Sequence, residues 1–174
     1  MSVWWSLLKK TAKSWDCRLS NFVPRPNRVE HEKAIKAYDK AIDLDPKNAE
    51  AWRNEGIALG DLEKHEEAIK AYDEAIELDP NNSKAWSHKG IALGNLERHE
   101  EAIKAYDEAI ELDPNNAITW KYKGIALGIL ESPEEAIKAY DKAIKLNPKN
   151  AILWGYKGFV LGGLGTKFIQ DFNQ

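Results

Sequence analysis

Residues 49–82, AEAWRNEGIALGDLEKHEEAIKAYDEAIELDPNN, decide the fold, because the 174-residue chain repeats this stretch with a period of 34 residues. Four residue types keep the period along most of the chain. They are Trp52, Trp86, Trp120 and Trp154; Gly56, Gly90, Gly124 and Gly158; Tyr38, Tyr72, Tyr106 and Tyr140; and Pro46, Pro80, Pro114 and Pro148. A period of this size indicates a stack of similar supersecondary units rather than one globular core. Stacks of this kind form long concave surfaces that usually bind other proteins.

Each unit is predicted to contain two amphipathic helices and a turn. Asn48 can cap a first helix over residues 49–62, whose apolar side chains recur at helical spacing. A second helix over 66–78 has its own apolar side, and the Asp79-Pro80 pair that follows ends it. Because neither helix can bury its apolar side alone, neighbouring units must stack on one another.

The pattern Trp-x3-Gly-x2-Leu, then Ala-x3-Tyr-x2-Ala and then Pro, resembles the tetratricopeptide repeat. The resemblance covers residues 31–164. Full repeats match at 49–82, 83–116 and 117–150, a second helix alone at 31–46, and a first helix alone at 151–164. The resemblance implies an all-α fold, a right-handed α-solenoid (superhelix) of antiparallel helix pairs. The chain departs from the family where leucine usually precedes the glycine: Glu55, Lys89, Lys123 and Lys157 stand there.

The full units differ from one another mainly in their first helices. Units 49–82 and 83–116 are identical at 27 of 34 positions, and all seven differences lie in or just after the first helix. In the family that the chain resembles, the first helices line a concave groove that holds the ligand. We therefore predict a partner-binding groove. Its candidate residues are Arg53, Ile57, Lys84, Ser87, His88, Ile91, Lys121, Tyr122, Ile125 and Tyr156.

This groove would suit a peptide or protein segment with apolar anchors and an acidic group. Two plainer interpretations stay open: the differences are drift at exposed sites after duplication, and the isoleucines pack against the next unit. Some family members hold a C-terminal carboxylate with a lysine, arginine and asparagine set. This chain does not reproduce that set, since isoleucine replaces the asparagine at Ile57, Ile91 and Ile125. A chaperone-tail clamp is therefore not expected.

No residue set outside the repeat suggests catalysis, a cofactor or a metal. His31, His65 and His99 occupy one place in successive units. Stacked helices lie roughly 10 Å apart, whereas a zinc–nitrogen bond is about 2.0–2.1 Å, so one ion cannot reach two of them. The expected function is therefore a non-enzymatic protein-interaction scaffold.

Charge and cysteine content exclude further classes. Residues 31–174 hold 19 basic and 26 acidic side chains, a poor surface for nucleic acid. A single cysteine, Cys17, fits a reducing cytoplasm.

The two ends differ from the repeat. Residues 1–30 are basic, and an amphipathic helix over 3–23 would either cap the array or lie on a membrane surface as an adaptor. Residues 165–174 are expected to be irregular. The exposed C-terminal face would then pair two copies as a homodimer, or the chain is the repeat portion of a longer array or a larger multidomain protein.

Overall fold

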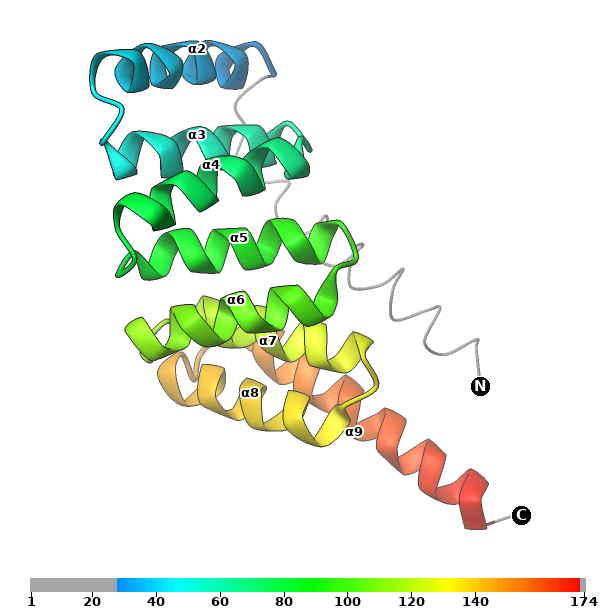
Figure 1. Cartoon of the computed structure of the whole chain (residues 1–174). Coiled ribbons are helices and arrows are strands. Elements are labelled where there is room, and N and C mark those ends of the chain that lie inside the picture. The colour runs from blue at the N-terminus through cyan, green and yellow to red at the C-terminus, as the bar shows by residue number, and fades with distance from the viewer. Residues whose placement is uncertain (1–27, 173–174) are drawn as a thin grey trace.

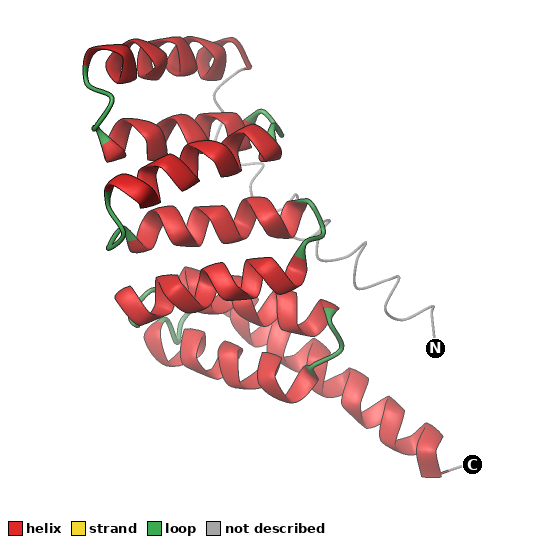
Figure 2. Cartoon of the chain, viewed as in Figure 1, coloured by secondary structure: helices red, strands yellow, loops and turns green. Residues whose placement is uncertain are grey.

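The computed structural model describes residues 28–172, with side chains as far as Gly163. This range contains eight α-helices and no strand. The helices are α2 (Arg28–Leu44), α3 (Ala49–Asp61), α4 (His65–Leu78), α5 (Ser83–Asn95), α6 (His99–Leu112), α7 (Ala117–Ile129), α8 (Pro133–Leu146) and α9 (Ala151–Phe172). They follow one another in a stack joined by short turns (Figures 1 and 2). The prediction of an all-α stack of helix pairs is confirmed.

The first helix of each unit begins where the sequence predicts. The side chain of Asn48 accepts a hydrogen bond from the backbone N–H of Ala51 at 3.0 Å, and Asn82 does the same for Ala85 at 3.1 Å. Asparagine is a favoured cap because its oxygen satisfies a backbone donor that the helix itself leaves unpaired. Local chemistry therefore fixes these helix starts.

Two residues after each first helix of the full units, a glutamate adopts a left-handed backbone conformation. The φ angles are 63° at Glu63, 62° at Glu97 and 57° at Glu131. This conformation turns the chain, and the backbone N–H that follows Glu63 bonds back to the carbonyl of Leu59 at 3.0 Å. The turn returns the chain antiparallel, so the second helix packs against the first.

The stack is curved, with the first helices on its inner side. Each helix packs against the next along the chain. The first helices α3, α5, α7 and α9 also contact one another in sequence, whereas the described second helices α2, α4, α6 and α8 do not. Units that approach more closely on one side than on the other form an arc, and the closer side is concave.

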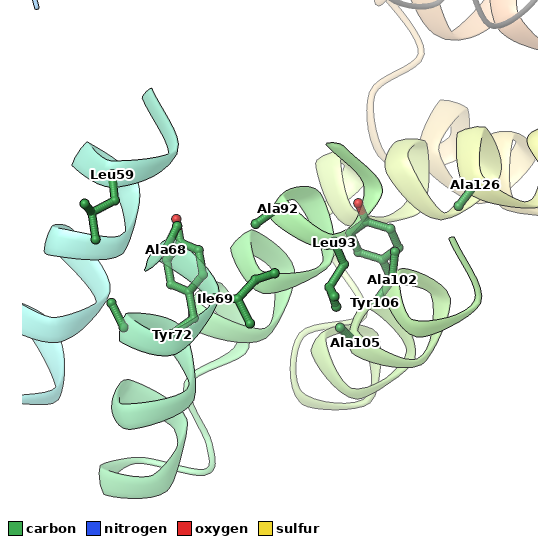
Figure 3. Packing of buried hydrophobic residues seen from close by; sticks show 11 residues of the cluster. Leu59, Ala68, Ile69, Tyr72, Ala92, Leu93, Ala102, Ala105, Tyr106 and Ala126 are labelled. Atoms are coloured by element: carbon green, nitrogen blue, oxygen red, sulfur yellow. The ribbon is translucent and has the colours of Figure 1, made fainter. Parts of the chain in front are cut away.

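In each full unit a tyrosine of the second helix packs directly against a glycine of the first helix. The space above this glycine is called the tyrosine seat below. A Cβ atom added at Gly90 would lie 2.4 Å from Cε1 of Tyr106, and one added at Gly56 would lie 2.5 Å from Cε1 of Tyr72. No side chain fits in that space, so glycine is required. Leu59, Ala68 and Tyr72 lie together in the first full unit, and corresponding residues repeat the arrangement one unit on (Figure 3).

The periodic tryptophans fix the joints between units. Nε1 of Trp120 donates to the carbonyl of Pro114 at 3.0 Å, so the ring ties the turn before α7 to α7 itself. The same bond is present at the other three joints, with lengths of 3.1 Å for Trp52, 3.3 Å for Trp86 and 3.1 Å for Trp154. This bond explains why tryptophan and proline share one period.

The C-terminal end differs from the prediction. Residues 165–174 were expected to be irregular, but α9 continues through Gly165 to Phe172. Gly165 occupies the place of Glu63, but residues 166–172 do not repeat the second-helix sequence that follows Glu63, so α9 has no second helix to turn back to. The predicted helix over 3–23 lies outside the described residues.

Candidate partner-binding face

The predicted groove residues belong to the first helices, and the structure places most of them at the joints between units. The ring of His88 lies 5.9 Å from that of Tyr72, measured between centroids. Tyr156 stacks on Tyr140 at 5.7 Å with 7° between the ring planes, and Tyr122 on Tyr106 at 6.4 Å with 18°. Each of these three rings therefore packs on the buried tyrosine of the preceding unit.

The isoleucines of the predicted groove both pack against the core and expose part of their side chains. Ile57, Ile91 and Ile125 are neither buried nor fully exposed, and each packs against a cluster of buried core residues. The interpretation that they pack between units is therefore correct in part. What remains exposed is a narrow apolar strip along the first helices.

Ser87 is not available to a partner, which corrects its assignment to the groove. It is only 4% exposed, and its hydroxyl lies 2.9 Å from that of Thr119, which is fully buried. The pair joins α5 to α7 where the first helices meet. Serine is short enough to remain inside this contact. This partner could not be predicted from the sequence, because Ser87 and Thr119 are 32 residues apart and occupy different positions in their units.

Arg53 occupies the place of Ser87 one unit earlier and is also largely covered. Its side chain is 17% exposed, and its guanidinium donates to Glu50 and to the side chain of Asn54, both at 3.1 Å. The Nε atom of Arg53 is buried with no hydrogen-bond partner in the structure. Arg53 therefore reinforces α3 and offers only part of its guanidinium to a ligand.

Two lysines carry the positive charge of the face. Lys84 is exposed at the start of α5, and its backbone carbonyl accepts a 2.7 Å hydrogen bond from Nδ1 of His88. Because a carbonyl can only accept, Nδ1 of His88 carries a hydrogen. Nζ of Lys121 lies 4.1 Å from the centroid of the Tyr122 ring. Lys121 therefore places a positive charge beside the Tyr122 ring, and Lys84 adds an exposed lysine at the start of α5.

A second periodic arrangement, which sequence analysis did not identify, lies at the joints. Lys89 pairs with Asp73 at 2.5 Å and Lys157 with Asp141 at 2.6 Å, and Lys123 pairs with Asp107 in the same way. The ammonium groups also lie over the rings of Trp86, Trp120 and Trp154, at 5.2, 5.6 and 5.9 Å from their centroids. The 34-residue spacing of these lysines and aspartates was the sequence signal that could have identified the repeated ion pairs.

The first joint breaks this pattern. Glu55 takes the place of the lysine, so it faces Asp39 instead of complementing it. Burial raises the pKa of Glu55, and the negative charge of Asp39 raises it further. Oε2 of Glu55 is buried without a hydrogen-bond partner. The α2–α3 joint therefore holds two carboxyl groups where later joints hold an ion pair.

Two open hollows lie on the other side of the stack. One, of about 480 Å³, opens between α6 and α8 with α7 as its floor. The other, of about 290 Å³, lies against α3 and α4. Trp120, Lys123 and Lys142 line the first, and Trp52, Glu55 and Glu74 line the second at matching places in the unit. Neither hollow is lined by a predicted groove residue.

The described residues contain neither a clustered metal-ligand set nor a membrane-spanning helix. No group of three or more histidine, cysteine, aspartate or glutamate side chains within the described residues is arranged to hold a metal ion. His31 lies 3.6 Å from Asp61, a two-residue contact only. None of the described helices has both the length and the apolar character needed to cross a membrane.

Comparisons with known proteins agree with this architecture. A family model described as the tetratricopeptide repeat matches residues 30–83, 54–117 and 88–151. A comparison with curated proteins finds no match.

Solved structures with the same fold include a crystal structure of MamA, with 27% identity and a TM-score of 0.74 over 78% of this chain and 79% of that one. MamA from Desulfovibrio magneticus RS-1, residues 41 to the end, aligns at 22% identity and a TM-score of 0.71, over 92% of this chain and 85% of that one. The first such domain of Spaghetti (RPAP3), bound to the HSP90 peptide SRMEEVD, aligns at 23% identity and a TM-score of 0.67, over 70% of this chain and 96% of that one.

Proposed function

Because the chain belongs to the tetratricopeptide repeat family, we propose that it is a non-enzymatic scaffold that holds a peptide or partner protein against the inner face of its first helices. The single observation that carries this proposal is the asymmetry of the stack. First helices contact one another, and the described second helices do not. The inner face is therefore continuous across units, and it is also where the units differ most in sequence.

The chemistry of the face suggests the kind of segment it takes. The exposed parts of Ile91 and Ile125 provide an apolar strip, the rings of His88 and Tyr122 border it, and Lys121 adds positive charge. A segment with apolar anchors and an acidic group would match this surface. The acidic balance of residues 31–174 argues against nucleic acid as the partner.

The RPAP3 domain is bound to an HSP90 peptide in its solved structure, and its likeness to this chain is at the level of fold. Ile57, Ile91 and Ile125 stand where the carboxylate clamp needs asparagine. Ser87, moreover, is buried rather than facing a ligand. We therefore propose a ligand bound through internal side chains rather than a C-terminal carboxylate.

A peptide library displayed on phage and selected on the wild-type protein provides the test. Selected peptides should bind Lys121→Glu at least about fivefold more weakly, since reversing one charge beside a bound acidic group costs on the order of 1 kcal/mol. Lys104→Glu is the matched control, because Lys104 is exposed on the second helix α6. The melting temperature of both variants should stay that of the wild type. Equal binding of the peptides to Lys121→Glu and Lys104→Glu would refute the proposal that the inner face binds them.

The proposal has three further parts. We propose a cytoplasmic location, which the single cysteine supports. The membrane-surface role of residues 3–23 is a competing proposal for a segment outside the described residues, and co-sedimentation with anionic liposomes tests it directly. The third part is self-association of the chain through the exposed ends of the stack.

A further inference from the structure

The two ends of the described stack are complementary halves of one repeat. Helix α2 corresponds to a second helix: residues 31–46 match residues 65–80 at 13 of 16 positions. Helix α9 corresponds to a first helix and begins at the same place in the unit as α3, α5 and α7. The two lie at opposite ends of the stack (Figure 1), so within one copy they do not complete each other.

The face of α9 that a second helix would cover is exposed. Leu161 is 48% exposed, whereas its equivalents Leu59, Leu93 and Leu127 are 5%, 2% and 7% exposed. Trp154 is 52% exposed. A Cβ atom added at Gly158 would meet nothing within 4 Å, although Gly90, its equivalent, seats the ring of Tyr106. Helix α9 therefore presents an empty tyrosine seat.

Helix α2 presents the side chains that fill such a seat. Its Ala34, Tyr38 and Ala41 repeat the Ala-x3-Tyr-x2-Ala pattern of α4, α6 and α8. In α4 the corresponding Ala68, Tyr72 and Ala75 are at most 3% exposed, but no residue of α2 is buried. Ala37 is exposed, whereas its equivalents Ala71, Ala105 and Ala139 are 2–3% exposed. The missing contact is with a first helix.

We propose that copies of this chain associate head to tail, with α9 of one copy and α2 of the next forming a complete repeat in which Tyr38 occupies the seat at Gly158. The occupant is a second copy because α2 carries the residues that fill this seat in every full unit. The two surfaces that meet are different, so the interface is heterologous and each copy leaves one of each kind open. Association then continues into a chain of copies rather than stopping at a symmetric dimer. The proposal does not depend on what the inner face binds.

Two glycines of α9 provide a matched pair of variants. Gly158→Ala adds a methyl group where the full units leave 2.4–2.7 Å to the tyrosine ring. Gly162→Ala adds the same group one turn later, where an added Cβ at Gly60 or Gly94 lies 3.9 or 3.8 Å from the tyrosine oxygen. Neither addition meets another atom within 4 Å in the single copy. Both variants should therefore fold as well as the wild type.

Sedimentation velocity of the full chain, from about 1 to about 300 µM, measures the association. Gly162→Ala is the control for Gly158→Ala. The average mass of the wild type and of Gly162→Ala should rise with concentration beyond the mass of a dimer. Gly158→Ala should raise the dissociation constant at least about tenfold through overpacking of the tyrosine seat. Unchanged circular-dichroism melting curves would show that all variants are folded.

A mixing experiment distinguishes this interface from a symmetric one. Ala37→Glu disables the α2 surface and leaves α9 intact, while Gly158→Ala does the reverse. At a concentration where the wild type associates and Gly158→Ala does not, each variant alone should be monomeric, and an equimolar mixture should form a 1:1 dimer and nothing longer. The proposal is overturned if the wild type is monomeric over the whole range, as it would be if residues 1–27 covered α2. It is also overturned if Gly158→Ala associates like Gly162→Ala, or if the mixture stays monomeric.

Discussion

Replacing Glu55 with lysine should strengthen the α2–α3 joint. At the three later joints a lysine pairs with an aspartate and covers a tryptophan ring, as Lys89 does with Asp73 and Trp86. At the first joint Glu55 meets Asp39, and Oε2 of Glu55 is buried without a hydrogen bond. Glu55→Lys would restore the arrangement that the rest of the chain uses.

The size of the effect follows from two contributions. Removing a partly buried, unpaired carboxylate oxygen gains on the order of 1 kcal/mol. The new pair with Asp39 is partly exposed and adds about 0.2–1 kcal/mol. A sum of about 1–2 kcal/mol corresponds to a factor of roughly 5–30 in the opening equilibrium of α2.

Native-state hydrogen exchange is the right assay, because terminal repeats open without the rest of the stack. Amides of α2 should exchange about 5–30 times more slowly in Glu55→Lys, while those of α7 and α8 stay unchanged. Glu77→Lys, an equal charge change at an exposed site on α4, should leave α2 as in the wild type. Exchange in α2 that is unchanged or faster in Glu55→Lys would refute the account of this joint.

The effect should depend on pH with a defined sign. The pKa of Glu55 is raised in the folded protein, first by burial and then by Asp39 and Glu67. A raised pKa means that the wild-type joint is most stable below the ordinary pKa of 4.5 and weakens as pH rises through the folded pKa. The advantage of Glu55→Lys should therefore grow as pH rises from about 4 toward neutrality.

Substitutions at two further contacts test the packing. Gly90→Ala should destabilise the protein by about 1–3 kcal/mol, because the new Cβ would lie 2.4 Å from Tyr106. Gly94→Ala should instead stabilise it by about 0.5–1 kcal/mol, because alanine has the higher helix propensity. Urea denaturation that ranks the two variants in the opposite order would contradict the tyrosine–glycine packing. Ser87→Ala should cost about 1–2 kcal/mol, because the buried hydroxyl of Thr119 loses its partner, and adding Thr119→Val should recover most of the loss. Additive losses in that double-mutant cycle would show that the two hydroxyls do not interact.

Much of the fold could be predicted because its signals are local and repeated. The asparagine caps, the Asp-Pro stops and the helical spacing of apolar residues each act within a few residues. Fourfold repetition of Trp86 and Gly90 equivalents then identified the family. The sequence shows that glycine recurs at the place of Gly90, but only the structure shows that the ring of Tyr106 requires it.

The candidate site was less predictable, because it depends on how one unit lies on the next. Ser87 and Arg53 share a position in the repeat, yet Ser87 bonds across to α7 while Arg53 bonds within its own helix. That outcome depends on side-chain length and on the approach of neighbouring first helices. A family offset alone cannot distinguish a groove residue from one buried in such a contact.

The sequence by itself determined the repeating helix pair, its boundaries and its place in a family, since each follows from short-range hydrogen bonding and periodic burial. Only the tertiary structure decided that Ser87 is buried against Thr119 and that Glu55 meets Asp39. It also decided that α2 and α9 each expose the face that the other could cover. The physical reason is that these features arise from the distance and register between units, which are set by packing over long stretches of chain.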